Sequence, residues 1–164
     1  MTSPLQISIR EDDLRGPEIA QLLQAHLANS SLHSPPESIH ALDLDGLRAP
    51  GITFWTAWQA STLLGCGGLK ELDRHHGEIK SMHTAHHARG QGVGRRVLQH
   101  IVDEAARRGY RRLSLETGSM AAFAPARALY ASFGFADCAP FANYRLDPYS
   151  VFMTLELAPR DRSP

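Results

Sequence analysis

The stretch EIKSMHTAHHARGQGVGRRVLQHIVDEAARRG, residues 78–109, decides the fold that we expect for this chain. Residues 78–84 alternate in the manner of a strand, and residues 93–108 carry apolar side chains at helical spacing with charged ones between them. Three glycines, at positions 90, 92 and 94, mark the junction. The stretch therefore predicts a strand, a glycine-rich loop and an amphipathic helix, in that order.

The glycine-rich loop is the strongest chemical signal in the sequence. Glycines allow successive backbone N–H groups to turn toward one point, and the N-terminus of the following helix adds a partial positive charge. The glycine spacing differs from that of a dinucleotide fingerprint, and Gly94-Arg95-Arg96 stands where a nucleotide P-loop requires Gly-Lys-Ser/Thr. We expect the loop to hold a pyrophosphate, with Arg89, Arg95 and Arg96 at its rim. The alternative is that the glycines only close a tight turn.

Further strands and helices are predicted on both sides of this unit. Period-two patterns and β-branched residues indicate strands at residues 6–10, 52–59, 62–72 and 111–117, from 135 onward, and at 150–157. Helical spacing and proline starts indicate helices from Pro17 up to a break at residues 29–31, from Ser34 toward Leu47, and from Pro125 through Phe133. We expect one α/β domain over residues 1–157, followed by a frayed tail at 158–164.

The composition is that of an ordinary globular domain. Hydrophobic residues make up 43% of the 164 residues and charged residues 21%, which excludes disordered and collagen-like classes. Because 17 basic residues balance 17 acidic ones, we expect no nucleic-acid partner. The sequence shows no apolar core of a signal peptide and no membrane span, and its two cysteines have neither disulfide-framework nor zinc spacing. We expect a cytoplasmic protein without membrane contact.

Two motifs together resemble a known family. Arg89, Gly92 and Gly94 match the pattern Arg/Gln-x-x-Gly-x-Gly/Ala after a strand. A second pattern, Ala-x-x-Leu-Tyr-x-x-x-Gly-Phe, is matched further along the chain by Ala126, Leu129, Tyr130, Gly134 and Phe135. With this spacing the chain resembles the GNAT superfamily of N-acetyltransferases, in its small stand-alone bacterial type. One departure is Phe123, at a position where many members carry Asn.

The resemblance implies a fold and a co-substrate. The fold is a single α/β (α+β) domain with a mixed, mostly antiparallel sheet of six or seven strands, helices on both faces, and splayed fourth and fifth strands. The pantetheine arm of acetyl-CoA would lie between the splayed strands, as an added strand does at a sheet edge. The cofactor-binding residues that follow from the resemblance are Met82, His83, Thr84, Arg89, Gly90, Gln91, Gly92, Val93, Gly94, Arg95, Ala126 and Leu129.

The resemblance also implies catalytic roles. Tyr130 matches the tyrosine that protonates the departing thiolate, and Glu78 stands where some members place a general base for the amine. Glu116, His40 and Trp55 are candidates for the acceptor side. We expect acetyl transfer to the amine of a small molecule or peptide by direct attack in a ternary complex.

Several alternatives stay open at this point. A non-catalytic acyl-CoA-binding sensor would need the loop but not Tyr130, and a nucleotide or phosphosugar binder would use the same loop. We expect no metal, because the clustered histidines lack regular ligand spacing, and no acyl-cysteine route, because neither cysteine has a histidine partner in sequence. Residues 32–47 carry acidic side chains that would weakly favour a cationic amine. The closing strands, residues 144–157, could pair across a homodimer.

Overall fold

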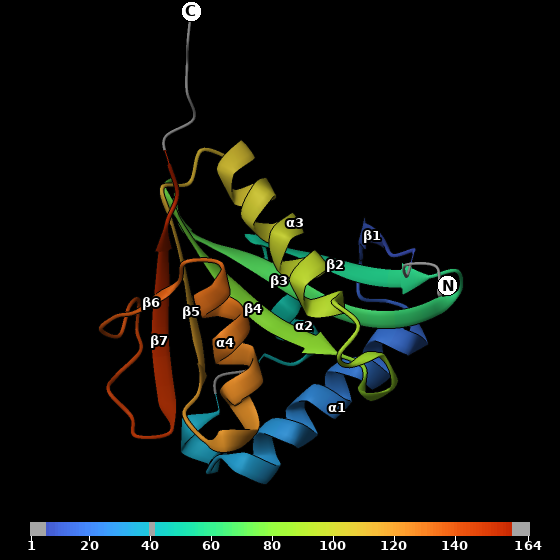
Figure 1. Ribbon diagram of the computed structural model, residues 1–164, viewed down its shortest axis with the longest axis horizontal. Helices are drawn as coiled ribbons and strands as arrows, with labels where there is room; N and C mark the ends of the chain where they lie inside the picture. The colour runs from blue at the N-terminus through green and yellow to red at the C-terminus, as the bar shows by residue number, and fades with distance from the viewer. Residues whose placement is uncertain (1–5, 40–41, 159–164) are drawn as a thin grey trace, which may run out of the picture.

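A computed structural model describes residues 6–39 and 42–158. It contains one sheet of seven strands in the order β1-β2-β3-β4-β5-β7-β6 (Figure 1). All neighbouring strands are antiparallel except β4 and β5, which are parallel. The strands are β1 (Ser8–Glu11), β2 (Ile52–Gln59), β3 (Thr62–Asp73), β4 (His76–Thr84), β5 (Arg112–Gly118), β6 (Ala136–Asp137) and β7 (Ser150–Glu156). The mixed, mostly antiparallel sheet of the expected fold is confirmed.

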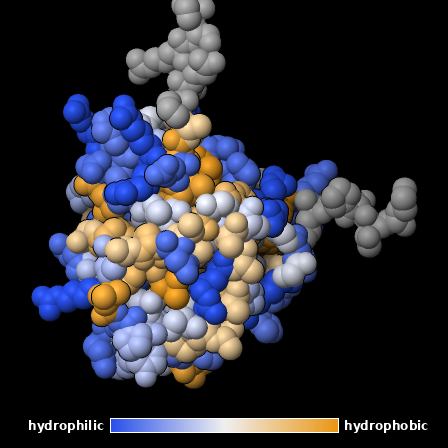
Figure 2. Space-filling model, turned by 60° about the vertical axis from the view of Figure 1, so that its left-hand side comes forward, coloured by the Kyte–Doolittle hydropathy of each residue, from blue (hydrophilic) through white to orange (hydrophobic). Residues whose placement is uncertain are grey.

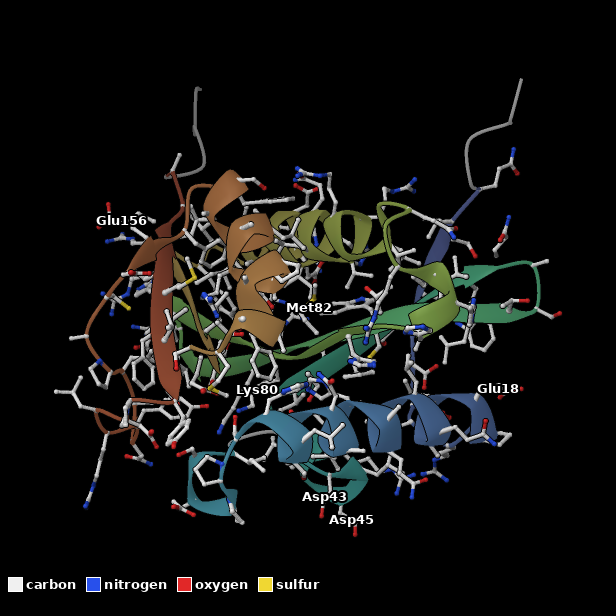
Figure 3. The ribbon with its side chains drawn as sticks, turned by 60° about the horizontal axis from the view of Figure 1, so that its bottom comes forward. Glu18, Asp43, Asp45, Lys80, Met82 and Glu156 are labelled. Atoms are coloured by element: carbon white, nitrogen blue, oxygen red, sulfur yellow. The ribbon has the colours of Figure 1, made fainter. Side chains whose placement is uncertain are left out.

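Helices cover both faces of the sheet. On one face lie α1 (Pro17–His33) and α2 (Leu44–Leu47), and on the other lie α3 (Val93–Arg107) and α4 (Ala124–Ser132), as Figure 3 shows. Short 3₁₀ turns add η1 (Pro36–Ser38), η2 (His86–Ala88) and η3 (Ala121–Phe123). The sheet is therefore the middle of three layers.

The packing of α3 follows the apolar stripe that its sequence predicts. Its buried residues are Val93, Val97, Leu98, Ile101 and Ala105. Glycine in β3 allows the helix to approach the sheet, because a Cβ on Gly67 would lie 2.6 Å from Met82 Sδ and 2.9 Å from Ile101 Cδ1. At the far end of α3, Arg108 Nη2 donates to Thr53 Oγ1 of β2 at 2.9 Å and fixes the helix to the sheet.

The two parallel strands diverge after a short region of pairing. Their register joins His76 to Arg112, Gly77 to Leu113 and Glu78 to Ser114, and the pairing ends there. Beyond this point β4 stays paired with β3, and β5 stays paired with β7. A wedge therefore opens between residues 79–84 of β4 and residues 115–118 of β5, as expected for splayed strands.

Several boundaries differ from the sequence prediction. Helix α1 continues past the expected break to His33, and Ser31 Oγ donates to the Leu27 carbonyl within it at 3.0 Å. The helix expected from Ser34 to Leu47 is divided into η1 and α2, with residues 40 and 41 outside the described part.

The end of the chain also differs from its prediction. Strand β6 is only two residues long, and residues 138–149 are irregular before β7 begins. Strand β7 pairs with β5 along its length, and β6 covers its other edge at residues 153 and 154. Pairing of residues 144–157 across a homodimer stays a prediction. Most of the predicted tail lies outside the described residues. On the face in Figure 2 the most hydrophobic residues reach the surface in small separate groups.

Candidate active site

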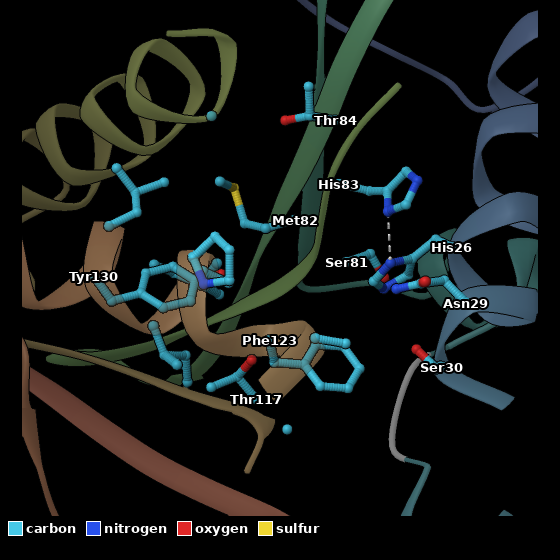
Figure 4. Close-up of a pocket in the computed structure, with 18 of the residues that line it drawn as sticks. His26, Asn29, Ser30, Ser81, Met82, His83, Thr84, Thr117, Phe123 and Tyr130 are labelled. Carbon is cyan, nitrogen blue, oxygen red and sulfur yellow. Dashed lines mark hydrogen bonds between the residues drawn. The ribbon is translucent and has the colours of Figure 1, made fainter. Parts of the chain in front are cut away.

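A cavity of about 820 Å³ occupies the wedge between β4 and β5. Its walls come from β4 and β5, from the glycine-rich loop and the start of α3, from α4, and from one side of α1 (Figure 4). Elements far apart in the sequence thus surround one space. The cavity is of the size that small-molecule and cofactor sites have.

The glycine-rich loop at one end of the cavity is shaped to receive an anion. Gly90 and Gly92 have φ angles of +74° and +82°, in the region that favours glycine. Gly92 is the N-cap of α3, whose first turn has no acidic residue, and a Cβ at Gly92 would meet nothing within 4 Å. Backbone N–H groups and the helix N-terminus therefore face open space beside the cavity, an arrangement that fits a pyrophosphate.

The arginines of this region have different partners. Arg89 and Arg95 line the cavity, and Arg95 Nη2 also donates to Ser132 Oγ of α4 at 3.2 Å. Arg96 instead turns to the carbonyl of Ile7, to which its Nη2 donates at 3.2 Å. Gln91, expected at the cofactor, donates to the His87 carbonyl and is absent from the cavity wall. Two of the three expected rim cations thus stand at the cavity.

Strand β4 carries an irregularity where it enters the cavity. Ser81 has a φ of +52°, and the pairing of β3 with β4 shifts register between Cys66 and Gly68. Because of this bulge, Met82 lies toward α3, whereas Lys80 and His83 lie on the α1 side (Figures 3 and 4). The Ser81 hydroxyl is buried and has no hydrogen-bond partner among the described residues. Bulges beside active sites redirect side chains in this way.

Tyr130 reaches the cavity from α4. It is 6% exposed, and its ring packs against Phe135 at a centroid distance of 5.8 Å. Burial, and then the negative charge of Glu116, raises the pKa of Tyr130 far above its ordinary value. Its hydroxyl therefore keeps its proton at neutral pH, as a proton donor requires. Glu116 also lines the cavity.

Glu78 stands at the closed end of the wedge with two partners. It is 2% exposed, and its Oε2 accepts from Lys80 Nζ at 3.2 Å and from the Tyr144 hydroxyl. Lys80 Nζ also donates to the Tyr144 hydroxyl at 3.0 Å. The same three residues line a second cavity of about 500 Å³, formed with η1 and the irregular segment before β7. They therefore separate the two cavities.

One side of α1 forms the wall opposite the glycine-rich loop. Its cavity residues are His26, Asn29, Ser30 and His33. His26 Nδ1 and His83 Nδ1 lie 3.1 Å apart in a hydrogen bond, shown dashed in Figure 4. Burial lowers the pKa of each to about 4, with the charge of Arg89 acting in the same direction on His83. Both rings are therefore neutral near pH 7.

Two acceptor-side expectations fall elsewhere, and a third concerns a residue outside the described part of the chain. Trp55 lies away from the cavity, contrary to the expectation: it is 4% exposed beneath α3, with its ring 5.3 Å from that of His100, because β3 separates its strand from β4. The acidic side chains of residues 32–47 do not form a rim at this cavity, since Asp43 caps α2, Asp45 pairs with Arg48 and Glu37 lines the second cavity. Asp43 and Asp45 point away from the sheet in Figure 3. His40 lies outside the described residues.

The structure also bears on three expectations that lie outside the cavity, which concern cysteine chemistry, metal binding and membrane insertion. Cys66 is buried, its Sγ donates to the Ser81 carbonyl at 3.4 Å, and burial raises the pKa of its thiol. Within residues 6–39 and 42–158, no group of three or more His, Cys, Asp or Glu side chains is placed to hold a metal ion. Over the same residues, none of the helices has the length and hydropathy needed to cross a bilayer.

Residues 17–135 match the family model described as the acetyltransferase (GNAT) family. The chain belongs to this family. YsnE of Bacillus subtilis (strain 168), named an uncharacterized N-acetyltransferase, is 60% identical over 149 residues, which cover 91% of this chain and 99% of that protein. An IAA acetyltransferase of Azospirillum brasilense is 44% identical over 120 residues, 73% of this chain and 77% of that protein.

A solved GNAT structure shares the fold. It is an acetyltransferase from Elizabethkingia anophelis with acetyl-CoA bound, and it superposes with a TM-score of 0.70 at 20% identity over 92% of this chain and 98% of that one. At this level of identity the likeness concerns the fold alone. The resemblance that the two motifs indicated is confirmed, and with it the splayed GNAT sheet.

The two GNAT motifs contribute the glycine-rich loop and α4 to the cavity, but they did not predict its wall at α1 and Tyr144. Four missed residues, at positions 26, 29, 30 and 33, follow the i, i+3, i+4, i+7 spacing of one helix face, a signal that was present in the sequence. Lys80 and Tyr144 were also missed. Tyr144 belongs to an irregular segment, where no regular spacing indicates which side chains lie together. Phe123, the departure from the GNAT pattern, lines the cavity and meets His33 at a ring distance of 5.9 Å.

Proposed function

We propose that this GNAT protein is an acetyl-CoA-dependent N-acetyltransferase in which an amine attacks the thioester directly in a ternary complex. The observation that carries the proposal is a single cavity that extends from an anion-binding glycine-rich loop, through the wedge between β4 and β5, to Tyr130 and Glu78. Acetyl-CoA has an anionic pyrophosphate, an extended arm and a reactive thioester in the same order. The bound acetyl-CoA of the Elizabethkingia anophelis relative supports the choice of co-substrate.

The cofactor would bind through groups that the wedge leaves available. The backbone N–H groups at Gly90 to Gly94, with Arg89 and Arg95, would hold the pyrophosphate. The inner edge of β4 at Met82, His83 and Thr84 has no strand partner on the β5 side and would pair with the pantetheine amides. Ala126 and Leu129 of α4 would cover the arm from the other side. Acetyl-CoA supplies the activated acetyl group.

Proton movements follow from the side chains at the closed end. As the amine nitrogen bonds to the acetyl carbon and the C–S bond breaks, Tyr130 gives its proton to the departing sulfur. The proton lost by the amine passes to Glu78, either directly or through Tyr144, whose hydroxyl already donates to Glu78. In the second route the Tyr144 oxygen takes the amine proton while its own proton moves to the carboxylate. No step requires a protein nucleophile, and the burial of Cys66 agrees with direct attack.

A screen for acetyl transfer tests this function. Purified protein would be incubated with acetyl-CoA and a panel of amines, with IAA added because of the Azospirillum brasilense relative. Released coenzyme A and the acetylated product would be measured together. The proposal predicts equal amounts of both with at least one amine. Binding of acetyl-CoA without any product over a broad panel would instead favour the sensor function.

A further inference from the structure

The wall of the cavity opposite the glycine-rich loop lies where α1 faces β4. Helix α1 buries Ile19, Leu22 and Leu23 on its apolar side. From His26 onward this same side carries polar residues and lines the cavity, although the inward side of a surface helix is ordinarily apolar. Polar side chains on the wall of a cavity indicate a ligand that forms hydrogen bonds with them.

The hydrogen bond between His26 and His83 restricts what their rings can present. Because the two Nδ1 atoms share one proton, the ring that donates carries no proton on its Nε2, and the ring that accepts carries its proton on Nε2. The pair therefore presents one N–H donor and one lone pair, whichever ring is the donor. Neither Nε2 has a hydrogen-bond partner among the described residues.

The charges around this pair disfavour a cationic group as its ligand. Burial holds both rings neutral, so that neither offers a charge to a carboxylate. The groups that act on the rings are Arg89, from the glycine-rich loop, and the two histidines themselves; no carboxylate of the described residues acts on either ring. A cationic group would therefore find no counter-charge at this place.

Ser81 adds an independent observation beside the pair. The residue is 9% exposed and lines the cavity, and its Oγ has no hydrogen-bond partner among the described residues. Figure 4 shows it next to His26. Since buried hydroxyls in folded proteins are nearly always hydrogen-bonded, this one marks a position for a polar atom of a ligand.

We propose that His26, His83 and Ser81 form a subsite that binds an uncharged group of the substrate amine able both to donate and to accept a hydrogen bond, namely a hydroxyl or a carboxamide. The subsite rests on the proposed function, because it names the class of amine that the transferase takes. A methyl group leaves the three side chains without partners. A carboxylate only accepts and an ammonium only donates, so each satisfies half of the histidine pair.

Calorimetry on the protein saturated with coenzyme A tests the subsite without turnover. The probes are short straight-chain primary amines that differ only at the far end, which is a hydroxyl, a carboxamide, a methyl, a carboxylate or a second ammonium group. The hydroxyl and carboxamide amines should bind about 10-fold more tightly than the methyl amine, and more tightly than both charged ones. The proposal is overturned if a charged or methyl amine binds as tightly, or if none of the amines binds.

Variants assign the discrimination to the histidine pair. His26→Leu should reduce the hydroxyl-to-methyl ratio to less than about 3-fold, whereas His75→Leu, in the exposed turn between β3 and β4 and away from the cavity, should keep it. Ser81→Ala is the second variant if His26→Leu does not fold, and it should lower the ratio as well. An unchanged ratio in both His26→Leu and Ser81→Ala contradicts the subsite. If hydroxyl amines bind preferentially but acetyl-CoA is consumed with no amine, the proposed function fails while the subsite stands.

Discussion

Glu78 of β4 and Ser114 of β5 form the last backbone pair between the two parallel strands. Up to this pair the sheet is continuous, and immediately beyond it the cavity begins. Glu78 therefore belongs both to the closed sheet, where it is buried, and to the wall of the wedge. In the proposed reaction, this carboxylate would stand beside the amine that attacks the thioester in the wedge.

The glycine-rich loop should lose its affinity for coenzyme A when it carries a negative charge. Gly92→Asp places a carboxylate where the N-terminus of α3 would meet the pyrophosphate. Gly92→Asn is the matched control, because Asn has the same shape without the charge and also tolerates a positive φ. Calorimetry should show a loss of about 10-fold or more for Gly92→Asp relative to Gly92→Asn. Equal affinities of the two variants for coenzyme A would show that the pyrophosphate does not bind at this loop.

Tyr130→Phe should reduce turnover while coenzyme A still binds. The variant keeps the ring packed against Phe135 and removes only the hydroxyl whose pKa is raised by burial. We expect kcat to fall by about 10²-fold or more. Tyr110→Phe is the control, since Tyr110 is also buried but donates to Glu71, away from the cavity. If Tyr130→Phe turns over like the wild type, another group protonates the sulfur.

Glu78→Gln should lower the rate of transfer and leave the affinity for coenzyme A unchanged. The variant keeps the shape of the side chain but removes the group that accepts the amine proton. The measurement is kcat/KM against pH with two acceptors whose amines differ in pKa. An acid limb that stays at the same pH for both acceptors and disappears in Glu78→Gln supports the base.

If the acid limb of kcat/KM instead follows the pKa of each acceptor, in both the wild type and Glu78→Gln, Glu78 is not the general base. Tyr144→Phe separates the two proton routes, because it keeps the ring and breaks the link between Tyr144 and Glu78. A loss as large as that in Glu78→Gln would favour the route through Tyr144, and a much smaller one the direct route.

The strand, loop and helix of residues 78–109 were predicted well from the sequence. The strand before the loop, the apolar side of α3 and the two motifs are local patterns, and each is read within one element. Phosphate binding at a helix N-terminus is likewise a property of a single short segment. Such local features can therefore be recognised in the sequence without knowledge of the fold.

The wall of the cavity away from this loop was predicted poorly, because it depends on contacts between distant segments. Tyr144 meets Glu78 across 66 positions, and His26 meets His83 across 57. The bulge at Ser81, which turns its neighbours to different faces, replaces a regular alternation that the sequence suggested. Trp55 was misplaced because the layer that covers its face of β2 is a property of the tertiary structure.

The histidine pair should make the protein less stable in mild acid. Both pKa values lie near 4 in the folded protein, below the ordinary value of 6.5, so that the unfolded chain binds more protons between these limits. The contribution of neutral histidines to stability is complete above about pH 6.5 and is lost progressively as the pH falls toward 4. From pH 7 to pH 5, the free energy of unfolding in urea should fall by about 2 kcal/mol more in the wild type than in His26→Leu. Parallel pH dependence in the two proteins would contradict the neutral pair.

The most direct test of the central claim is the initial rate of coenzyme A release with acetyl-CoA and an active acceptor amine both varied. Direct attack in a ternary complex predicts double-reciprocal lines that intersect, and no acetylated protein when acetyl-CoA is added alone. Parallel lines together with an acetyl group on the protein would contradict the account, because they require a protein nucleophile that the cavity around Tyr130 and Glu78 is not proposed to use.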